Sequence, residues 1–249
     1  SDVCSSDLDR LIAVKHQMGG GSAFRPGREA AMMRALLMRH RGLLPLDTIE
    51  GIWRIIISTF TFVQASFSVH ADFSGGDAGV RDSARFHFGF TVPLIAHEGV
   101  AGVIDAVALA SGDLGLVRLD GGAAKGAWWT ALAPPMAPKV ISRLPMVQRQ
   151  DHPASLAVFV VSKPLNEAAS REVIVYSIRT DRWHNDIERE VRFLGGEMLA
   201  SAADEPGLSL LVSAPGAFSA EELRKRLLLC GCNDIRISEI GSHAAINRV

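Results

Sequence analysis

The segment PLDTIEGIWRIIISTFTFVQASFSV, residues 45–69, decides how the first third of the chain is interpreted. Its apolar residues recur at helical spacing and so share one face of a helix. That face carries Ile49, Trp53, Ile56 and Phe60, followed by Gln64 one turn later. Asp47, with Glu50 three residues further on, is typical of a capping box at a helix start. The segment therefore predicts an amphipathic helix that packs its apolar stripe into a core.

The residues upstream of this segment predict two more helices. In RPGREAAMMRALLMRH, residues 25–40, Pro26 falls in the first turn, where its missing N–H costs nothing. Apolar residues then follow at helical spacing. A run of residues 9–15 reads as the end of an earlier helix, because the three glycines at 19–21 cannot continue it. The sequence thus predicts an all-helical module over residues 9–66.

Polar residues from these three helices form a recognisable set. The strings AVK, FRPGREAAMMRAL and IWRIIISTFTFVQ resemble the all-helical chorismate mutase family, which has three helices per subunit and forms an intertwined dimer. The resemblance implies rearrangement of chorismate to prephenate without a cofactor or metal. It also implies a homodimer through the helical module. Cationic groups would hold the substrate, and donors would stabilise the ether oxygen as it gathers negative charge.

The resemblance assigns a role to each residue of this set. Lys15 and Gln64 would donate to the ether oxygen, Arg28 would contact a carboxylate or hydroxyl, and Glu29 would bind the substrate hydroxyl. Two positions depart from the family pattern and would adjust substrate contacts. Phe60 stands where a small hydroxyl residue is common, and Arg25 stands where many members carry an acid.

The charge of this first part favours an anionic ligand. Residues 9–66 hold eight Lys and Arg but four Asp and Glu. A solvated basic face would account for the same count. The basic residues are not interleaved with aromatic residues or with a nucleic-acid reader motif, so we expect no nucleic-acid partner.

The remainder of the chain alternates between strand-like and helix-like segments. Residues 68–163 predict an α/β module, and residues 170–243 follow the order β-α-β-β-α-β of a ferredoxin-like module. Their order resembles prephenate dehydratase, with a periplasmic-binding-like body and an amino-acid-binding ACT domain. We interpret the α/β module as a degenerate relative. Two alternatives are a sensor of aromatic amino acids and a bifunctional chorismate mutase and prephenate dehydratase.

Composition places the chain among ordinary globular proteins. It is 48% hydrophobic and 21% charged with a net charge of −1, and its apolar runs are too short to span a membrane. Cys4, Cys230 and Cys232 do not suggest a disulfide framework. No secretory signal pattern is visible, so we expect a cytoplasmic protein.

Residues 1–8, SDVCSSDL, interrupt the first predicted helix. They can be encoded by the end of a common sequencing adapter, and we interpret them as a non-native segment. The family expects an arginine at the position that Cys4 occupies. We therefore expect weak or no chorismate mutase activity from this chain.

Smaller motifs favour structural roles. His97 and Glu98 precede a helix and are expected to cap it, and His184 with Glu188 is expected on an exposed helix face rather than at a metal. Cys230-Gly-Cys232 predicts two buried thiols, and the pair at 128–129, both tryptophans, predicts core packing.

Overall fold

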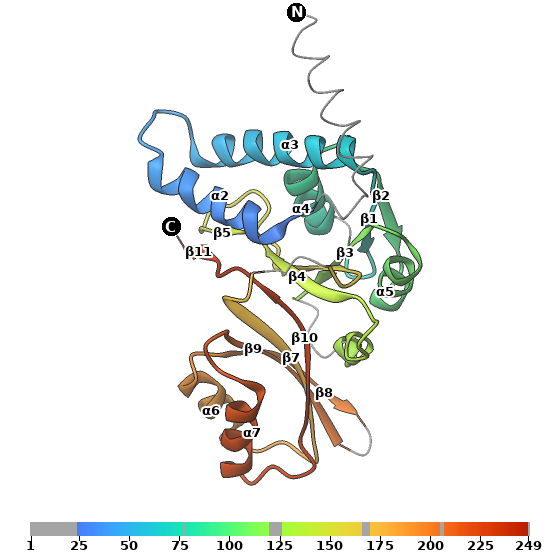
Figure 1. Ribbon diagram of the computed structural model, residues 1–249, viewed down its shortest axis with the longest axis vertical. Coiled ribbons are helices and arrows are strands. Elements are labelled where there is room, and N and C mark those ends of the chain that lie inside the picture. Colours follow the sequence, from blue (N-terminus) through green and yellow to red (C-terminus); the bar gives the residue numbers. More distant parts are fainter. Residues whose placement is uncertain (1–23, 77, 120–125, 166–169, 205–206, 249) are drawn as a thin grey trace, which may run out of the picture.

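One mixed β-sheet runs through most of the molecule (Figure 1). The computed structural model describes residues 24–76, 78–119, 126–165, 170–204 and 207–248. Within these ranges, helices α2 (Pro26–Arg39) and α3 (Leu46–Gln64) precede a nine-stranded sheet. Its strand order is β2-β1-β3-β6-β4-β10-β7-β9-β8.

The first part of this sheet is parallel. β1 (Val69–Asp72) pairs with β2 (Leu94–His97) on one side and with β3 (Leu114–Arg118) on the other. Helix α4 (Ala78–Phe88) joins β1 to β2, and α5 (Val100–Leu109) joins β2 to β3. Because the two crossovers run in opposite directions, right-handed connections place α4 and α5 on opposite faces. The hydrophobic clusters confirm this placement, because α4 packs in one cluster and α5 packs in another.

The centre of the sheet turns antiparallel. β6 (Val158–Ser162) lies between β3 and β4 (Lys139–Leu144) and is antiparallel to both. A 3₁₀ helix, η2 (Trp128–Leu132), precedes β4. β5 (Val147–Gln148) pairs instead with β11 (Asn247–Arg248), close to the end of the chain.

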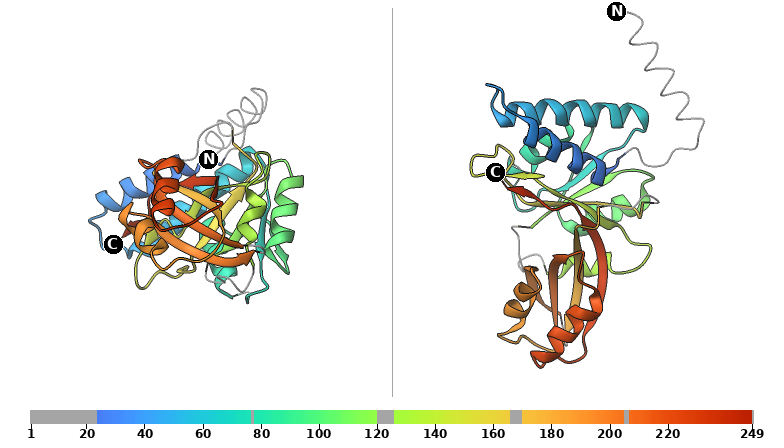
Figure 2. Two further views of the ribbon diagram at one scale, coloured as in Figure 1. Left: turned by 90° about the horizontal axis from the view of Figure 1, so that it is seen from below. Right: turned by 60° about the vertical axis from the view of Figure 1, so that its left-hand side comes forward.

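The last part follows the order β-α-β-β-α-β. It comprises β7 (Val173–Thr180), α6 (Ile187–Phe193), β8 (Glu197–Asp204), β9 (Gly207–Pro215), α7 (Ala220–Leu229) and β10 (Arg236–His243). Helices α6 and α7 cover one face of these strands (Figure 2). The spacing of Ser219 and Glu222 in the sequence predicts a capping box, and the structure forms it at the start of α7.

A close backbone approach joins the two parts of the sheet. β10 pairs with β4 at Gly241 and Val140, next to a β-bulge in β10. Gly241 has a φ of +142°, and a Cβ there would lie 2.1 Å from the carbonyl oxygen of Val140. Behind the junction, one hydrophobic cluster draws side chains from α5, η2 and strands of both parts. The multidomain fold class expected from the sequence is therefore wrong, because sheet and core are continuous, although the order β-α-β-β-α-β expected of residues 170–243 is present.

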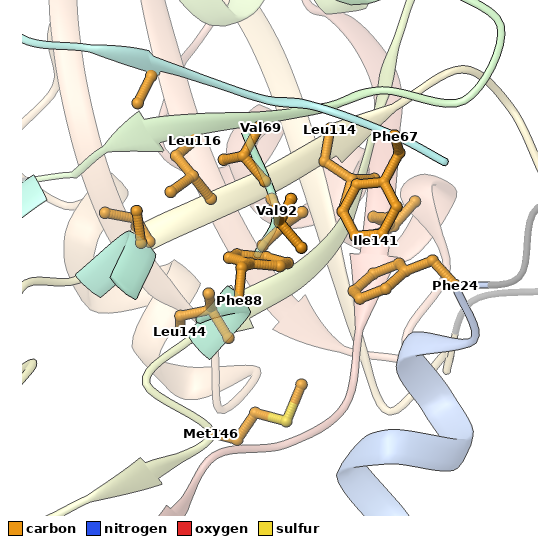
Figure 3. Close-up of a cluster of buried hydrophobic side chains, with 14 of the residues drawn as sticks. Phe24, Phe67, Val69, Phe88, Val92, Leu114, Leu116, Ile141, Leu144 and Met146 are labelled. Carbon is orange, nitrogen blue, oxygen red and sulfur yellow. The ribbon is translucent and has the colours of Figure 1, made fainter. Parts of the chain in front are cut away.

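The expected all-helical module is also wrong. Helices α2 and α3 form at the predicted places, but they pack on the sheet and share its core. Ala30 and Met33 of α2 belong to the cluster that contains Val69 and Leu114 of the strands. Phe24, just before α2, points into the same cluster (Figure 3). The mixed sheet with packed helices overturns the resemblance to the all-helical chorismate mutase family.

Helix α3 is turned opposite to its predicted orientation. Its buried side chains are polar: Glu50, Arg54, Ser58 and Thr61. Trp53, Ile56 and Phe60, the predicted core stripe, are 39%, 38% and 41% exposed. The predicted cap is wrong too, since Pro45 is the N-cap residue and no side chain caps the helix. None of the described helices combines the length and apolar character that crossing a membrane requires.

Candidate functional site

The carboxyl ends of β1, β2 and β3 meet at one edge of the sheet. These strands end at Asp72, His97 and Arg118, and both α4 and α5 begin at this edge. The chain leaves β1 for β2 and then crosses back to β3 on the other side of β1. In open α/β sheets, ligands bind at such a switch point, outside the carboxyl ends of the strands.

A chain of hydrogen-bonded side chains leads to this edge. Asp113, just before β3, lies 3.0 Å through Oδ2 from Nε2 of His70 in β1. Nδ1 of His70 lies 2.9 Å from Nε2 of His97 at the end of β2. The other oxygen of Asp113 accepts a hydrogen bond from the backbone N–H of Ser68 at 2.9 Å. We call Asp113, His70 and His97 the relay.

The donor and acceptor capacity of each group indicates where the protons of the relay lie. A carboxylate can only accept, so His70 donates from Nε2 to Asp113. In the tautomer of His70 that carries its only ring proton on Nε2, Nδ1 is an acceptor, and His97 donates to it from Nε2. Nδ1 of neutral His97 consequently carries a lone pair, and the relay ends on a proton acceptor.

Burial decides the protonation of this terminal histidine. Burial lowers the pKa of His97 below its usual value. His97 is therefore neutral near pH 7 and able to take up a proton. A Cβ added to Gly102 in the first turn of α5 would lie 3.1 Å from Nδ1 of His97, so this helix start is close to the acceptor atom.

The loop after β1 forms hydrogen bonds with the ends of all three strands. The backbone N–H of Phe73 donates to the carbonyl of His97 at 2.9 Å. Oδ1 of the fully buried Asp72 accepts from the N–H of Ser74 at 2.9 Å and from its hydroxyl at 2.6 Å. The guanidinium of Arg118 donates to the carbonyls of the glycines at 75–76, at 2.7 and 2.8 Å. These bonds hold the edge rigid beside His97.

This edge holds groups that attract an anion as well as the carboxylates of Asp72 and Glu98. Two helix N-termini meet there, and neither α4 nor α5 has an acidic residue in its first turn. Gly99 is the N-cap residue of α5, and no side chain caps that helix, so the expected capping by His97 and Glu98 is wrong. The uncapped N–H groups of α5 and the helix dipole attract negative charge, and the guanidinium of Arg118 lies at the same edge.

A second polar cluster lies buried between α2, α3 and α4. The guanidinium of Arg54 donates to Glu29 Oε2 at 2.7 Å and to the backbone carbonyl of His87 at 2.9 and 3.2 Å. Glu29 is 5% and Arg54 1% exposed. Both charges are paired within the fold, so this cluster anchors α2 and α3 to α4.

Glu50, one turn before Arg54 on α3, extends this polar cluster. One oxygen accepts from Arg149 at 2.8 Å, and the other lies 3.4 Å from Nε2 of His152. His152 stacks on His87 with ring centroids 6.2 Å apart. These partners come from residues about a hundred positions later and explain why the polar side of α3 turns inward.

Buried histidines predict a loss of stability in acid. Burial lowers the pKa of His87 well below its usual value, and burial lowers that of His243 to about 4. Below pH ~6.5 both histidines bind protons in the unfolded chain, whereas in the folded protein they stay unprotonated until a lower pH. The unfolding free energy should therefore be full above pH ~6.5 and fall toward pH 4, by up to about 1.4 kcal/mol per pH unit for each histidine.

Urea unfolding at a series of pH values checks this prediction. His243→Gln and His87→Gln should each make the decline shallower, because the variant no longer takes up that proton on unfolding. The same decline in both variants and in the parent chain would contradict it.

Among the described residues, those that the sequence assigned to substrate are spread over α2 and α3 and the residue before α2. Lys15 lies outside the described residues. Arg25 and Arg28 are exposed at the start of α2, and the carboxylate of Glu29 is engaged by Arg54. Gln64 ends α3 ten residues beyond Arg54, which is about 15 Å along the helix. Phe60 lies on the outward face, 41% exposed. Their roles in chorismate binding remain predictions.

The smaller motifs divide between confirmation and correction. Trp129 is fully buried and donates to the hydroxyl of Ser209 at 2.9 Å, so its core role is confirmed. Cys232 is buried and Cys230 half-buried, and burial raises the pKa of Cys230 to about 11. His184 lies before α6 rather than on it. Among the described residues, no group of three or more potential ligands is placed to hold a metal ion.

Sequence analysis missed two members of the relay. His70 interrupts an apolar strand, and Asp113 directly precedes another, which are signals of buried polar groups. They are 43 residues apart in sequence, and only the pairing of β1 with β3 brings them together.

Comparisons with known proteins add little. No protein-family model matches the chain, and no curated protein matches its sequence. A solved structure titled "GqqA- a novel type of quorum quenching acylases" is similar over 72% of this chain and 95% of its own, at 11% identity and a TM-score of 0.43. Acylase activity is a property that this title gives to that protein.

Proposed function

We propose that this protein is an enzyme that moves a proton on a small carboxylate bound at the carboxyl ends of β1, β2 and β3. The relay from Asp113 through His70 to His97 is the observation that carries the proposal. His97 is the catalytic residue, and its Nδ1 accepts the proton. His70 and Asp113 are positioning residues that fix which nitrogen of His97 is free.

The relay also supports the charge that forms on His97. When Nδ1 takes up a proton, the ring becomes an imidazolium that still donates from Nε2 to His70. His70 in turn donates to the carboxylate of Asp113, which supplies the compensating negative charge. Positioned general bases of this kind contribute about 10²–10⁴ in rate.

The substrate class follows from the donors beside His97. The first turn of α5 presents N–H groups that no side chain caps, and the guanidinium of Arg118 lies at the same edge. A carboxylate matches these donors. Chorismate and prephenate, the substrates expected from the sequence, are dicarboxylates and belong among the probes.

The test is a screen in D₂O followed by NMR. We would incubate the full chain with 2-oxo acids, chorismate and prephenate, and follow loss of carbon-bound hydrogen or formation of product. For a probe that reacts, His97→Gln should lower kcat by about 10²–10⁴. Glu98→Gln is the matched control, because Glu98 is exposed beside His97 and outside the relay. A reacting probe whose rate survives His97→Gln contradicts the proposal.

A further inference from the structure

The outward face of α3 is an exposed apolar surface. Six large side chains on this helix are between 38% and 54% exposed: Ile52, Trp53, Ile55, Ile56, Phe60 and Val63. The last turn of α2 adds Met38, and the segment between α2 and α3 adds Leu43 and Leu44; all three are 57% exposed or more. We call these nine residues the α3 face.

The α3 face carries no charge along most of the helix. Between Glu50 and Gln64 the sequence holds one further charged residue, Arg54. Glu50 and Arg54 both point inward, into ion pairs with Arg149 and Glu29. The fold has thus placed the charges of α3 inside and its apolar side chains outside, which reverses the usual preference of a surface helix.

The size of the α3 face is that of a protein interface. From the exposed fractions and ordinary side-chain areas, its nine residues expose roughly 900 Å². Monomeric proteins rarely expose apolar patches beyond a few hundred Å². A standard interface buries about 800 Å² on each partner. The summed area therefore lies in the range of a standard interface.

We infer that the α3 face binds the α3 face of a second copy of this chain. A two-fold axis across α3 would set the same surface against itself, as closed dimers do. Along the helix the face has no charge for a different partner to match, and the exposed charges of Arg39, Arg41 and Asp47 lie only at its end near the start of α3. Apolar contact therefore dominates, and homodimer interfaces are the more apolar class. The helix is 19 residues, or about 28 Å, long, which gives two crossing copies several turns of contact.

Sedimentation equilibrium on the full chain tests the inference. We expect a dimer at micromolar concentration, and we expect Ile56→Glu to raise the dimer Kd at least about 100-fold, because it buries a charge at the centre of the interface. The matched control is Leu109→Glu at the end of α5, which is 87% exposed and outside the α3 face. Thermal unfolding of both variants verifies that they fold.

Three results would overturn the inference. One is a parent chain that is monomeric at about 100 µM. A monomer overturns the inference both if residues 1–23 of the same chain occupy the α3 face and if the chain co-sediments with phosphatidylcholine vesicles. Another is a dimer that Ile56→Glu leaves intact. The third is a dimer that Leu109→Glu disrupts as strongly as Ile56→Glu does.

Discussion

Arg54→Leu is expected to lower the unfolding free energy by about 3–5 kcal/mol. The substitution removes the partner of Glu29, whose carboxylate is 5% exposed and 2.7 Å from the guanidinium. It also leaves the carbonyl of His87 without two of its donors. Breaking a buried pair from one side leaves an uncompensated charge in the interior, which is far more costly than losing a surface pair.

Urea denaturation of purified variants measures this effect. Arg28→Leu is the matched control, because Arg28 is exposed one residue before Glu29, and it should change stability by no more than about 0.5 kcal/mol. The double variant Glu29→Leu with Arg54→Leu should regain much of the loss, since it removes both charges. Equal stability of Arg54→Leu and Arg28→Leu would contradict a structural role for the pair.

Gly241→Ala is expected to cost at least about 4 kcal/mol, or to prevent folding. Its Cβ would lie 2.1 Å from the carbonyl oxygen and 2.5 Å from the backbone nitrogen of Val140. Both atoms belong to the neighbouring strand and cannot move aside as a side-chain tip can. The φ of +142° adds strain for any residue with a Cβ. The contact lies where β10 joins β4, so the substitution acts on the continuity of the whole sheet.

Gly112→Ala is the control for this variant. A Cβ at Gly112 meets nothing within 4 Å, so alanine should leave stability unchanged within about 0.5 kcal/mol. Denaturation midpoints of both variants give the comparison. Similar midpoints would mean that the two parts of the sheet do not depend on this junction.

Local signals in the sequence predicted several elements of the fold. Pro26 lies in the first turn of α2 as expected, and the Ser219–Glu222 capping box starts α7. These features involve residues within one or two turns of each other. Neighbouring residues alone determine them, so sequence reasoning reaches them.

Non-local partners decided what the sequence did not reveal. Helical spacing shows which residues of α3 share a face, but it does not show which face turns inward. The inward face is polar because Arg149 and Glu29 pair with Glu50 and Arg54. The relay likewise depends on strand pairing over some forty residues, so neither Asp113 nor His70 could be assigned from its neighbours.

Nitrogen NMR of the histidine side chains tests the central claim most directly. Long-range ¹H–¹⁵N correlations of the full chain near pH 7.5, assigned with His70→Gln and His97→Gln, report which ring nitrogen carries hydrogen. The relay predicts a proton on Nε2 and none on Nδ1 for both His70 and His97. It also predicts that malonate, a small dicarboxylate probe, shifts the Nδ1 signal of His97. A proton on Nδ1 of His97, or a signal that malonate leaves unchanged, would contradict the account.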